Sequence, residues 1–292
     1  MSGVILLESI KQLTDKYDIF ILDLWGVIHD GQHTYPNAKR TLEALKQHNK
    51  RIVLLSNAPR RAQTVAEMML HMGITSDMYD KIVTSGEVFY QCLAHPEKSF
   101  FKPHGRHYIY IGLEKDRHIL GGLNYTEVKQ PESAQFVLLS HSFYDNQPIK
   151  ELVPLMKECI KAKLPLLCVN PDKEVVSLSG HHVYCAGILA EEYRMMGGEI
   201  TYFGKPHRAV YEASLEGLEH HGKKRIIAIG DSLGTDIAGA ARTGLANVLV
   251  TGGIVKKTLG EPSAPDYKEK LDKLFRDEGI KPDYVIPEFI WQ

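Results

Sequence analysis

Residues 19–31 read IFILDLWGVIHDG, and the interpretation of the whole sequence starts from this stretch. The apolar run Ile19–Leu22 has the length of a buried strand, and the glycines that follow are typical of a turn. Asp23 stands where the strand gives way to the turn, a place where a carboxylate can act as a nucleophile or bind a metal ion. Trp25 follows two residues later, so the stretch also predicts a bulky ring near that carboxylate.

The pattern of a short apolar run, a turn and a helical segment recurs along the chain, which indicates a parallel sheet covered by helices. Near the N-terminus it predicts strands at 19–22, 51–57 and 81–86, with a helix after each of the first two. From about residue 100 it restarts, with strands at 106–112, 135–141 and 164–172 and helices at 149–163 and 187–196. The last part predicts a strand from residue 200, a helix opened by Pro206, and strands at 224–231, 246–253 and 282–289.

This order of elements predicts one domain that is interrupted by a second. The fold class is α/β, with a doubly wound, mostly parallel, Rossmann-like core formed by residues 1–86 and 200–292. Residues 87–199 form an inserted α/β cap domain, which we expect to lie over one face of the core.

Composition excludes several classes of partner. The 292 residues carry 35 basic and 36 acidic side chains, so no overall field favours a nucleic acid or an anionic membrane. No apolar run approaches the roughly 18 residues of a membrane span, and the N-terminus lacks the features of a signal peptide. The four cysteines form no CxxC pair, which favours reduced thiols in a cytoplasmic protein. A homodimer is left open.

Polar side chains stand at the predicted ends of several strands: Asp23, Ser56 with Asn57, Lys205, and Asp231 with Asp236. Ligands bind beyond the carboxyl ends of the strands in an open parallel sheet, so these groups can meet there. Carboxylates, a hydroxyl and an ammonium suit a phosphate group and Mg²⁺. Each signal also has a simpler explanation: Asp23 as a turn former, Asp236 as a helix N-cap, and Gly-Lys-Pro as a helix start.

Taken together, these segments resemble the haloacid dehalogenase (HAD) superfamily of phosphohydrolases. FILDLWGVIHDG resembles motif one, VLLSNAPRR motif two, YFGKPH motif three and AIGDSLGTDIAGA motif four. The chain is most similar to class IIA, in which a large α/β cap separates motifs two and three, as in 4-nitrophenylphosphatase-like and pyridoxal phosphatase-like enzymes. The resemblance covers essentially the whole chain and implies a Mg²⁺-dependent enzyme that acts on a small phosphorylated metabolite.

The resemblance also implies a role for each residue at the strand ends. Asp23 would be the nucleophile that accepts the phosphoryl group, and would bind the metal together with Asp231. Asp236 would orient Asp231 or a bound water from outside the metal's own ligand set. Lys205 would neutralise charge in the transition state.

The same comparison assigns phosphoryl contacts to motif two and substrate contacts to the cap. The Ser56 hydroxyl and the backbone amide of Asn57 would bind phosphoryl oxygens. In the cap, Asn170 and Asp172, with the loop at Cys185–Gly187, are the candidates for substrate recognition. Asp172 is as readily explained as a turn residue.

Motif one departs from the family pattern D-x-D, because Trp25 stands where the second aspartate acts as general acid and base. The Trp25 backbone carbonyl can still bind the metal, but an indole cannot transfer the proton. General acid–base catalysis typically contributes about 10²–10⁴ in rate. The sequence therefore predicts one of three outcomes: slow or restricted hydrolysis, a proton from His29 or Asp30, or binding without turnover. Of these two residues, Asp30 is better explained as a turn former.

Two other functions were compared with the phosphatase. A degenerate member of the family would bind a phosphorylated ligand or a protein partner without catalysis. A dinucleotide-binding oxidoreductase is disfavoured, because no G-x-G-x-x-G follows the first strand and an acidic strand end would repel a pyrophosphate.

Overall fold

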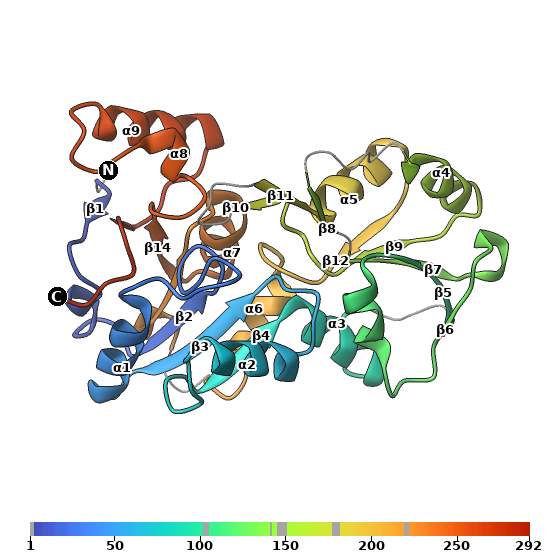
Figure 1. Ribbon diagram of the computed structural model, residues 1–292, viewed down its shortest axis with the longest axis horizontal. Helices are drawn as coiled ribbons and strands as arrows, with labels where there is room; N and C mark the ends of the chain where they lie inside the picture. Colours follow the sequence, from blue (N-terminus) through green and yellow to red (C-terminus); the bar gives the residue numbers. More distant parts are fainter. Residues whose placement is uncertain (1–2, 102–104, 141, 145–150, 177–181, 219–221) are drawn as a thin grey trace.

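The computed structural model contains a larger part built on a seven-stranded sheet and a smaller part built on two further sheets (Figure 1). It describes residues 3–101, 105–140, 142–144, 151–176, 182–218 and 222–292. Both chain ends lie at the edge of the larger part (Figure 1). The α/β class predicted from the sequence is confirmed.

The seven strands of the larger sheet are all parallel. Their order across the sheet is β1 (Ile5–Leu6), β15 (Tyr284–Ile286), β14 (Ala246–Val250), β13 (Ile226–Gly230), β2 (Ile19–Asp23), β3 (Arg51–Ser56) and β4 (Lys81–Thr84). Every residue of β2 is buried, because helices cover both faces of the sheet. Phe20 and Leu22 pack in one apolar cluster, whereas Ile19 and Ile21 pack in another on the opposite face. This alternation explains why the strand is a continuous apolar run.

The apolar spacing that the sequence predicted after β2 and β3 is present among the helices around this sheet. They are η1 (Ile10–Leu13), α1 (Ala38–Gln47), α2 (Ala62–His71), α3 (Ser85–Ala94), α6 (Arg208–Leu215), η6 (Lys223–Arg225), a π-helical turn η7 (Leu233–Ile237), α7 (Ala238–Thr243), α8 (Lys256–Leu259) and α9 (Tyr267–Glu278). Leu42 and Leu45 of α1 and Met69 of α2 join the cluster of Phe20, and Phe89 of α3 joins that of Ile19. Helices α3, α8 and α9 and the short strand β1 have no counterpart among the predicted elements.

The smaller part is called the cap below and comprises residues 107–202. Its parallel sheet has the order β12 (Ile200–Tyr202), β9 (Leu166–Cys168), β7 (Phe136–Leu139), β5 (His107–Ile111) and β6 (Thr126–Glu127). The accompanying helices are η2 (Glu114–Leu120), η3 (Pro131–Ser133), α4 (Val153–Lys161) and α5 (Ala186–Met195). A three-stranded antiparallel sheet of β10 (Glu174–Val176), β11 (His182–Cys185) and β8 (Ser142–Tyr144) was not predicted.

Several predicted boundaries shift in the structure. The strand expected at 81–86 ends at Thr84, because the Thr84 hydroxyl accepts a hydrogen bond from Glu87 N at 2.9 Å and starts α3. The helix expected from Pro206 begins at Arg208, after the N-cap His207. The helix expected at 149–163 is α4, which is shorter, and Ile149 lies outside the described residues.

The strand that begins at residue 200 also belongs elsewhere than expected. It was assigned to the core, but β12 pairs in register with β9, with Thr201 opposite Leu167. By strand pairing, the chain therefore leaves the cap after Tyr202. The ranges 1–86, 87–199 and 200–292 otherwise stay a prediction.

The four cysteines are free and buried. Within the described ranges, no helix combines the length and apolar character that crossing a membrane requires.

Phe203, directly after β12, joins the two parts of the molecule. Its side chain is fully buried, with its ring centroid 5.0 Å from that of Phe89, 5.4 Å from Phe100 and 5.8 Å from Phe101. The same apolar cluster contains Ile21 of β2 and Leu167 of β9, so it is continuous between the larger sheet and the cap sheet.

We expect Phe203→Ala to lower the free energy of unfolding by about 3–5 kcal/mol, because it leaves a cavity in that shared core. Phe100→Ala is the matched control: Phe100 touches the same ring but is 57% exposed, so its loss should cost far less. Denaturant unfolding of both variants measures the difference. Equal effects of the two substitutions would contradict a continuous core at Phe203.

Candidate active site

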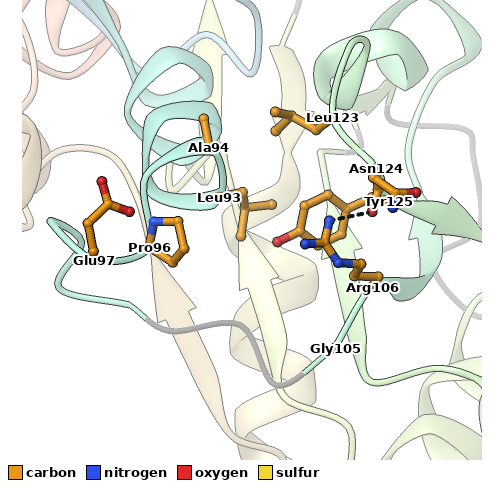
Figure 2. A pocket seen from close by; sticks show the side chains of 9 residues that line it. All are labelled: Leu93, Ala94, Pro96, Glu97, Gly105, Arg106, Leu123, Asn124 and Tyr125. Atoms are coloured by element: carbon orange, nitrogen blue, oxygen red, sulfur yellow. Dashed lines mark hydrogen bonds between the residues drawn. The ribbon is translucent and has the colours of Figure 1, made fainter.

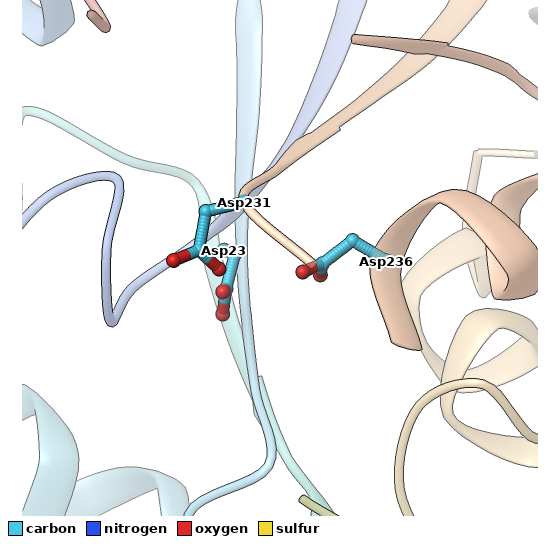
Figure 3. Close-up of side chains that lie close together, drawn as sticks. All are labelled: Asp23, Asp231 and Asp236. Atoms are coloured by element: carbon cyan, nitrogen blue, oxygen red, sulfur yellow. The ribbon is translucent and has the colours of Figure 1, made fainter. Parts of the chain in front are cut away.

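The parallel register brings the predicted residues to one edge of the larger sheet. Asp23 is the last residue of β2 and pairs with Leu55, so Ser56 of the neighbouring strand follows immediately beside it. On the other side Leu22 pairs with Ile229, and Asp231 comes directly after β13. Asp236 enters from the π-helical turn η7 (Figure 3).

The three aspartates form a compact acidic cluster. Their ligand oxygens lie within 4.8 Å of one another, and Figure 3 shows the three carboxyl groups side by side. All three residues are buried, and so is Lys205. The Lys205 ammonium lies between two of them, with Nζ 2.6 Å from Asp23 Oδ1 and 2.7 Å from Asp236 Oδ1. Three carboxylates therefore face a single ammonium group.

The electrostatics of the cluster follow from this imbalance. Burial, and next the charge of Asp236, raise the pKa of Asp231 to about 7. Burial and the same neighbour also raise the pKa of Asp23. Burial alone would lower the pKa of Lys205, but the charges of Asp23 and Asp236 outweigh it and raise that pKa. The cluster thus keeps its ammonium charged and still lacks positive charge for its carboxylates.

The donor set suits a divalent cation such as Mg²⁺. Asp23 Oδ1 accepts hydrogen bonds from Lys205 and from Leu24 N, and Asp231 Oδ2 accepts one from Ile254 N at 2.8 Å. These bonds leave the second oxygens, Asp23 Oδ2 and Asp231 Oδ1, to bind a cation. A divalent ion would balance the excess carboxylate charge, as expected for a metal held by oxygen ligands.

Glycines allow the backbone to approach Asp231 closely. A Cβ added to Gly26, which has a φ of +85°, would lie 1.9 Å from Asp231 Oδ2, and one added to Gly253 would lie 2.1 Å away. Both positions therefore require glycine.

In contrast to Asp23 and Asp231, Asp236 has both carboxylate oxygens bound to groups of the protein. Its Oδ2 accepts a hydrogen bond from Ser232 N at 3.2 Å, and its Oδ1 binds Lys205. This arrangement fits an orienting role better than direct metal binding.

Motif two contributes a hydroxyl and an amide. Ser56 Oγ accepts a hydrogen bond from Ala58 N at 3.1 Å, which fixes the oxygen and leaves its O–H able to donate. The Asn57 side chain is buried and bonds to both backbone groups of Lys205, with Oδ1 2.7 Å from Lys205 N and Nδ2 3.2 Å from Lys205 O. The predicted role of Asn57 involves only its backbone amide, so this side-chain contact was not predicted.

Trp25 packs within its own turn. Its indole ring lies 5.8 Å from the His29 ring, centroid to centroid, in an edge-on arrangement. Gly31, with a φ of +95°, lies against the ring so closely that an added Cβ would be 2.2 Å from Trp25 Cη2. The turn is closed by a hydrogen bond from Gly26 N to His29 O at 2.9 Å. The ring is thus held by residues of the turn that follows Asp23.

His29 and Asp30, the two alternative proton sources, both have structural roles. Asp30 Oδ1 accepts hydrogen bonds from Gln32 N at 2.9 Å and from His33 N, as expected for a turn former. His29 is buried, and its Nδ1 accepts a hydrogen bond from Gly31 N at 2.9 Å, so a neutral ring carries its proton on Nε2. Burial lowers the pKa of His29 to about 4. A neutral, buried imidazole is a poor general acid at pH 7.

The cap candidates lie in a tight turn that contacts motif two. Asn170 is buried, and its Oδ1 accepts a hydrogen bond from Asp172 N at 3.3 Å. Asp172 Oδ1 accepts one from Asn57 Nδ2 at 2.8 Å. Gly187 N, from the loop at Cys185–Gly187, donates to Asp172 O at 2.9 Å. The three predicted cap segments are therefore brought together next to Asn57, and their contact with substrate stays a prediction.

Other residues around the site were not identified from the sequence. The Tyr211 hydroxyl donates to Asp236 O at 3.0 Å and supports the turn that carries this aspartate. Burial, followed by the nearby charges of Asp231, Asp30 and Asp23, raises the pKa of Tyr35 to about 12. Arg60 Nε lies 2.9 Å from Asp116 Oδ1, an ion pair that links the loop after β3 to the cap. These contacts depend on tertiary structure and have no local sequence signal.

A separate cavity of about 670 Å³ lies between the end of α3 and the residues that immediately precede strands β5 and β6 (Figure 2). Leu93, Leu123 and Tyr125 line it, together with the Arg106 side chain, whose Nη1 donates to Asn124 O at 3.0 Å. None of the predicted site residues lines this cavity.

The pKa of His29 has a consequence for stability. In the unfolded chain histidine titrates near 6.5, so protons bind the unfolded state first as the pH falls, and stability is lost between about pH 6.5 and 4. We expect the titration of His29 to lower the free energy of unfolding by roughly 2–3 kcal/mol when the pH falls from 7 to 4.5. In His29→Gln the amide can still accept from Gly31 N, but the titration is gone.

Chemical denaturation of both proteins without metal, at pH 7 and at pH 4.5, measures the effect. The His29→Gln protein should lose less stability over this range than the unsubstituted protein. Parallel losses in both would show that His29 is not held neutral in the folded state.

Comparisons with known proteins give one consistent family. A model of the haloacid dehalogenase-like hydrolases matches residues 20–126, and a second model, for HAD-like hydrolases, matches residues 202–289. The sugar-phosphatase AraL of Bacillus subtilis is 24% identical over 258 residues, which are 85% of this chain and 88% of that protein.

Solved structures agree with these matches. A haloacid dehalogenase-like hydrolase from Brucella suis is similar, with a TM-score of 0.80, 29% identity, and coverage of 97% of this chain and 100% of that one. A glycerol phosphate phosphatase from Mycobacterium tuberculosis, solved in complex with magnesium, shares the fold with a TM-score of 0.62 at 22% identity, over 86% of this chain and 73% of its own.

Proposed function

Because this chain belongs to the haloacid dehalogenase-like hydrolases, we propose that it is a Mg²⁺-dependent phosphohydrolase acting on a small phosphorylated metabolite. The observation that carries the proposal is the placement of the Lys205 ammonium, 2.6 Å from Asp23, inside a cluster of three buried carboxylates. The sugar-phosphatase activity named for the Bacillus subtilis relative supports the substrate class.

Asp23 performs the first step as a nucleophile. One of its carboxylate oxygens attacks phosphorus, a new P–O bond forms, and the ester P–O bond breaks. The leaving oxygen departs with the bonding electron pair and, where it is a strong base, takes up a proton from the solvent. Lys205, already beside Asp23, balances negative charge on the phosphoryl group, and the Ser56 hydroxyl donates a hydrogen bond to one of its oxygens.

Water completes the reaction by attacking the aspartyl-phosphate. A new P–O bond to the water oxygen forms, the bond between phosphorus and Asp23 breaks, and inorganic phosphate leaves. The attacking water loses its proton to the solvent, because the indole at position 25 cannot accept it. The carboxylate of Asp23 is regenerated for the next cycle.

Asp23, Asp231 and the backbone carbonyl of Trp25 would hold the magnesium ion, with Asp236 orienting them. Bound there, the ion would neutralise negative charge on the carboxylates and the phosphoryl oxygens. The free carboxylate oxygens and the excess negative charge of the cluster support this assignment.

Trp25 removes the usual source of the two proton transfers. An indole N–H does not titrate usefully, and His29, with its pKa lowered to about 4, is neutral at pH 7. The enzyme should therefore favour substrates whose leaving group needs no proton, such as aryl or acyl phosphates. Hydrolysis of alkyl phosphates should be slower than with a general acid and base in place, by a factor of up to about 10²–10⁴ in rate.

A second candidate function follows from the same residue. If the loss of the acid and base is complete, the protein binds a phosphorylated ligand or a protein partner and does not hydrolyse it. The replacement at Trp25 is the observation in its favour.

We expect Asp23→Asn to abolish turnover of 4-nitrophenyl phosphate and acetyl phosphate in the presence of Mg²⁺, because the amide is not a nucleophile. Asp272→Asn, an exposed position on α9, is the control and should keep full activity. Release of phosphate is measured for both substrates. Equal release by the Asp23→Asn and unsubstituted proteins would rule out this mechanism, and no release by either would favour the binding function.

We expect Trp25→Asp to raise the turnover of an alkyl phosphate such as glycerol phosphate by at least tenfold, because it supplies a titrating carboxylate at the position of the missing acid and base. Trp25→Asn is the matched control, since it removes the ring without supplying a proton donor that titrates. A rise of equal size in both variants would mean that the indole merely obstructs the site. A fall in both would give Trp25 a positive role.

A further inference from the structure

The side chain of Asn57 connects three parts of the molecule. It stands directly after β3, and its amide bonds to the backbone of Lys205 through Oδ1 at 2.7 Å and Nδ2 at 3.2 Å. The same Nδ2 donates to Asp172 Oδ1 of the cap at 2.8 Å. One amide thus joins the strand end of motif two, the loop that carries Lys205, and the cap.

The partners of this amide fix its orientation. Lys205 N is a donor, whereas Lys205 O and the Asp172 carboxylate are acceptors, so only Oδ1 can face the first and only Nδ2 the other two. Both hydrogens of the NH₂ group are used, one for Lys205 O and one for Asp172. An aspartate at position 57 could not make either of these two donations.

The loop and the cap turn are packed closely enough for this contact to matter. A Cβ added to Gly204 would lie 2.4 Å from Asn57 Oδ1 and 2.7 Å from Pro171 Cδ. A Cβ added to Gly187 would lie 2.3 Å from Pro171 O. Asn57 on one side and the cap turn on the other therefore enclose the backbone immediately before Lys205.

The position of this backbone decides where the ammonium lies. Lys205 is 2% exposed, and its Nζ makes two short ion pairs, to Asp23 and to Asp236. A displacement of the backbone at residue 205 would lengthen one or both of them. Charge stabilisation in a buried site depends steeply on such distances.

We propose that Asp172 is a positioning residue, which holds the Asn57 amide and, through it, keeps Lys205 in place when the cap is docked on the core. The proposal rests on the function assigned above and revises the role of Asp172 from substrate contact to a link between cap and catalytic lysine. It needs Asp172 only as a hydrogen-bond acceptor for Asn57.

A substrate contact and a positioning link predict different kinetics. Lys205 acts on the phosphoryl group, which all substrates share, so loss of the link should lower kcat by the same factor for each substrate. A specificity contact would instead change KM, and by amounts that depend on the leaving group.

The test uses five variants of the full chain, one of them a control. Asp172→Ala removes the acceptor, Asn57→Ala removes the amide, and the double variant removes both. Asp172→Asn keeps an oxygen that can accept from Asn57 Nδ2. Asp116→Asn is the control, because it weakens another contact between cap and core, with Arg60, without touching Asn57.

Two measurements are made with Mg²⁺ present: kcat and KM for 4-nitrophenyl phosphate and acetyl phosphate, and the affinity for orthophosphate by calorimetry. We expect Asp172→Ala to lower kcat about tenfold for both substrates and to weaken phosphate binding by a similar factor, the effect of losing one charge-assisted hydrogen bond. Asp172→Asn should restore most of the loss. The double variant should be no worse than Asn57→Ala, and Asp116→Asn should change each quantity less than twofold.

The outcomes separate this proposal from the function on which it rests. A substrate-dependent change in KM, additive effects in the double variant, or an equal loss in Asp116→Asn would overturn the link. If the unsubstituted protein binds phosphate but turns over neither substrate, the hydrolase function fails, and the phosphate affinities of the variants still decide the role of Asp172. Absence of phosphate binding in the unsubstituted protein overturns both.

Discussion

The buried ammonium of Lys205 is the interaction on which the arrangement of the site depends. A charge that is 2% exposed is tolerated only when it is paired, and here it is paired twice, with Asp23 and with Asp236. Those two carboxylates come from different elements, the end of β2 and the turn η7. The lysine therefore holds together segments that are far apart in the sequence. The cluster still has more carboxylates than ammonium groups, and this excess negative charge would be balanced by a cation.

The edge of the sheet could be predicted from the sequence because parallel strands obey a simple rule. A short, continuous apolar run that ends in a turn, such as Ile19–Leu22, is typical of a strand covered on both faces, and the polar residue after such a strand stands at its carboxyl end. That rule placed Asp23, Ser56 and Asp231 correctly. The side-chain bonds of Asn57 lay beyond it, because they depend on the path of a loop 148 residues away along the chain.

The elements that sequence reasoning missed differ in kind. Strand β1 is two residues long and exposed, and β10, β11 and β8 have three or four residues, too few for an apolar alternation to stand out. Helix α9 is another matter: Tyr267, Leu271 and Phe275 recur every four residues and are buried, so its pattern was present in the sequence. A third case is the packing of Trp25 in the turn after β2. Gly31 lies against the ring where an added Cβ would be 2.2 Å from Trp25 Cη2, and no sequence pattern predicts such a contact.

The assignment of β12 to the cap sheet has a consequence for how such a molecule can be taken apart. The strand ends at Tyr202, and only Phe203 and Gly204 separate it from Lys205. Lys205 therefore stands on the return connection between the two parts, not inside the larger sheet. The cap is consequently not a detachable module: exchanging it for one of another size or shape would also move the backbone that leads into Lys205, and with it the ion pairs of Lys205 with Asp23 and Asp236.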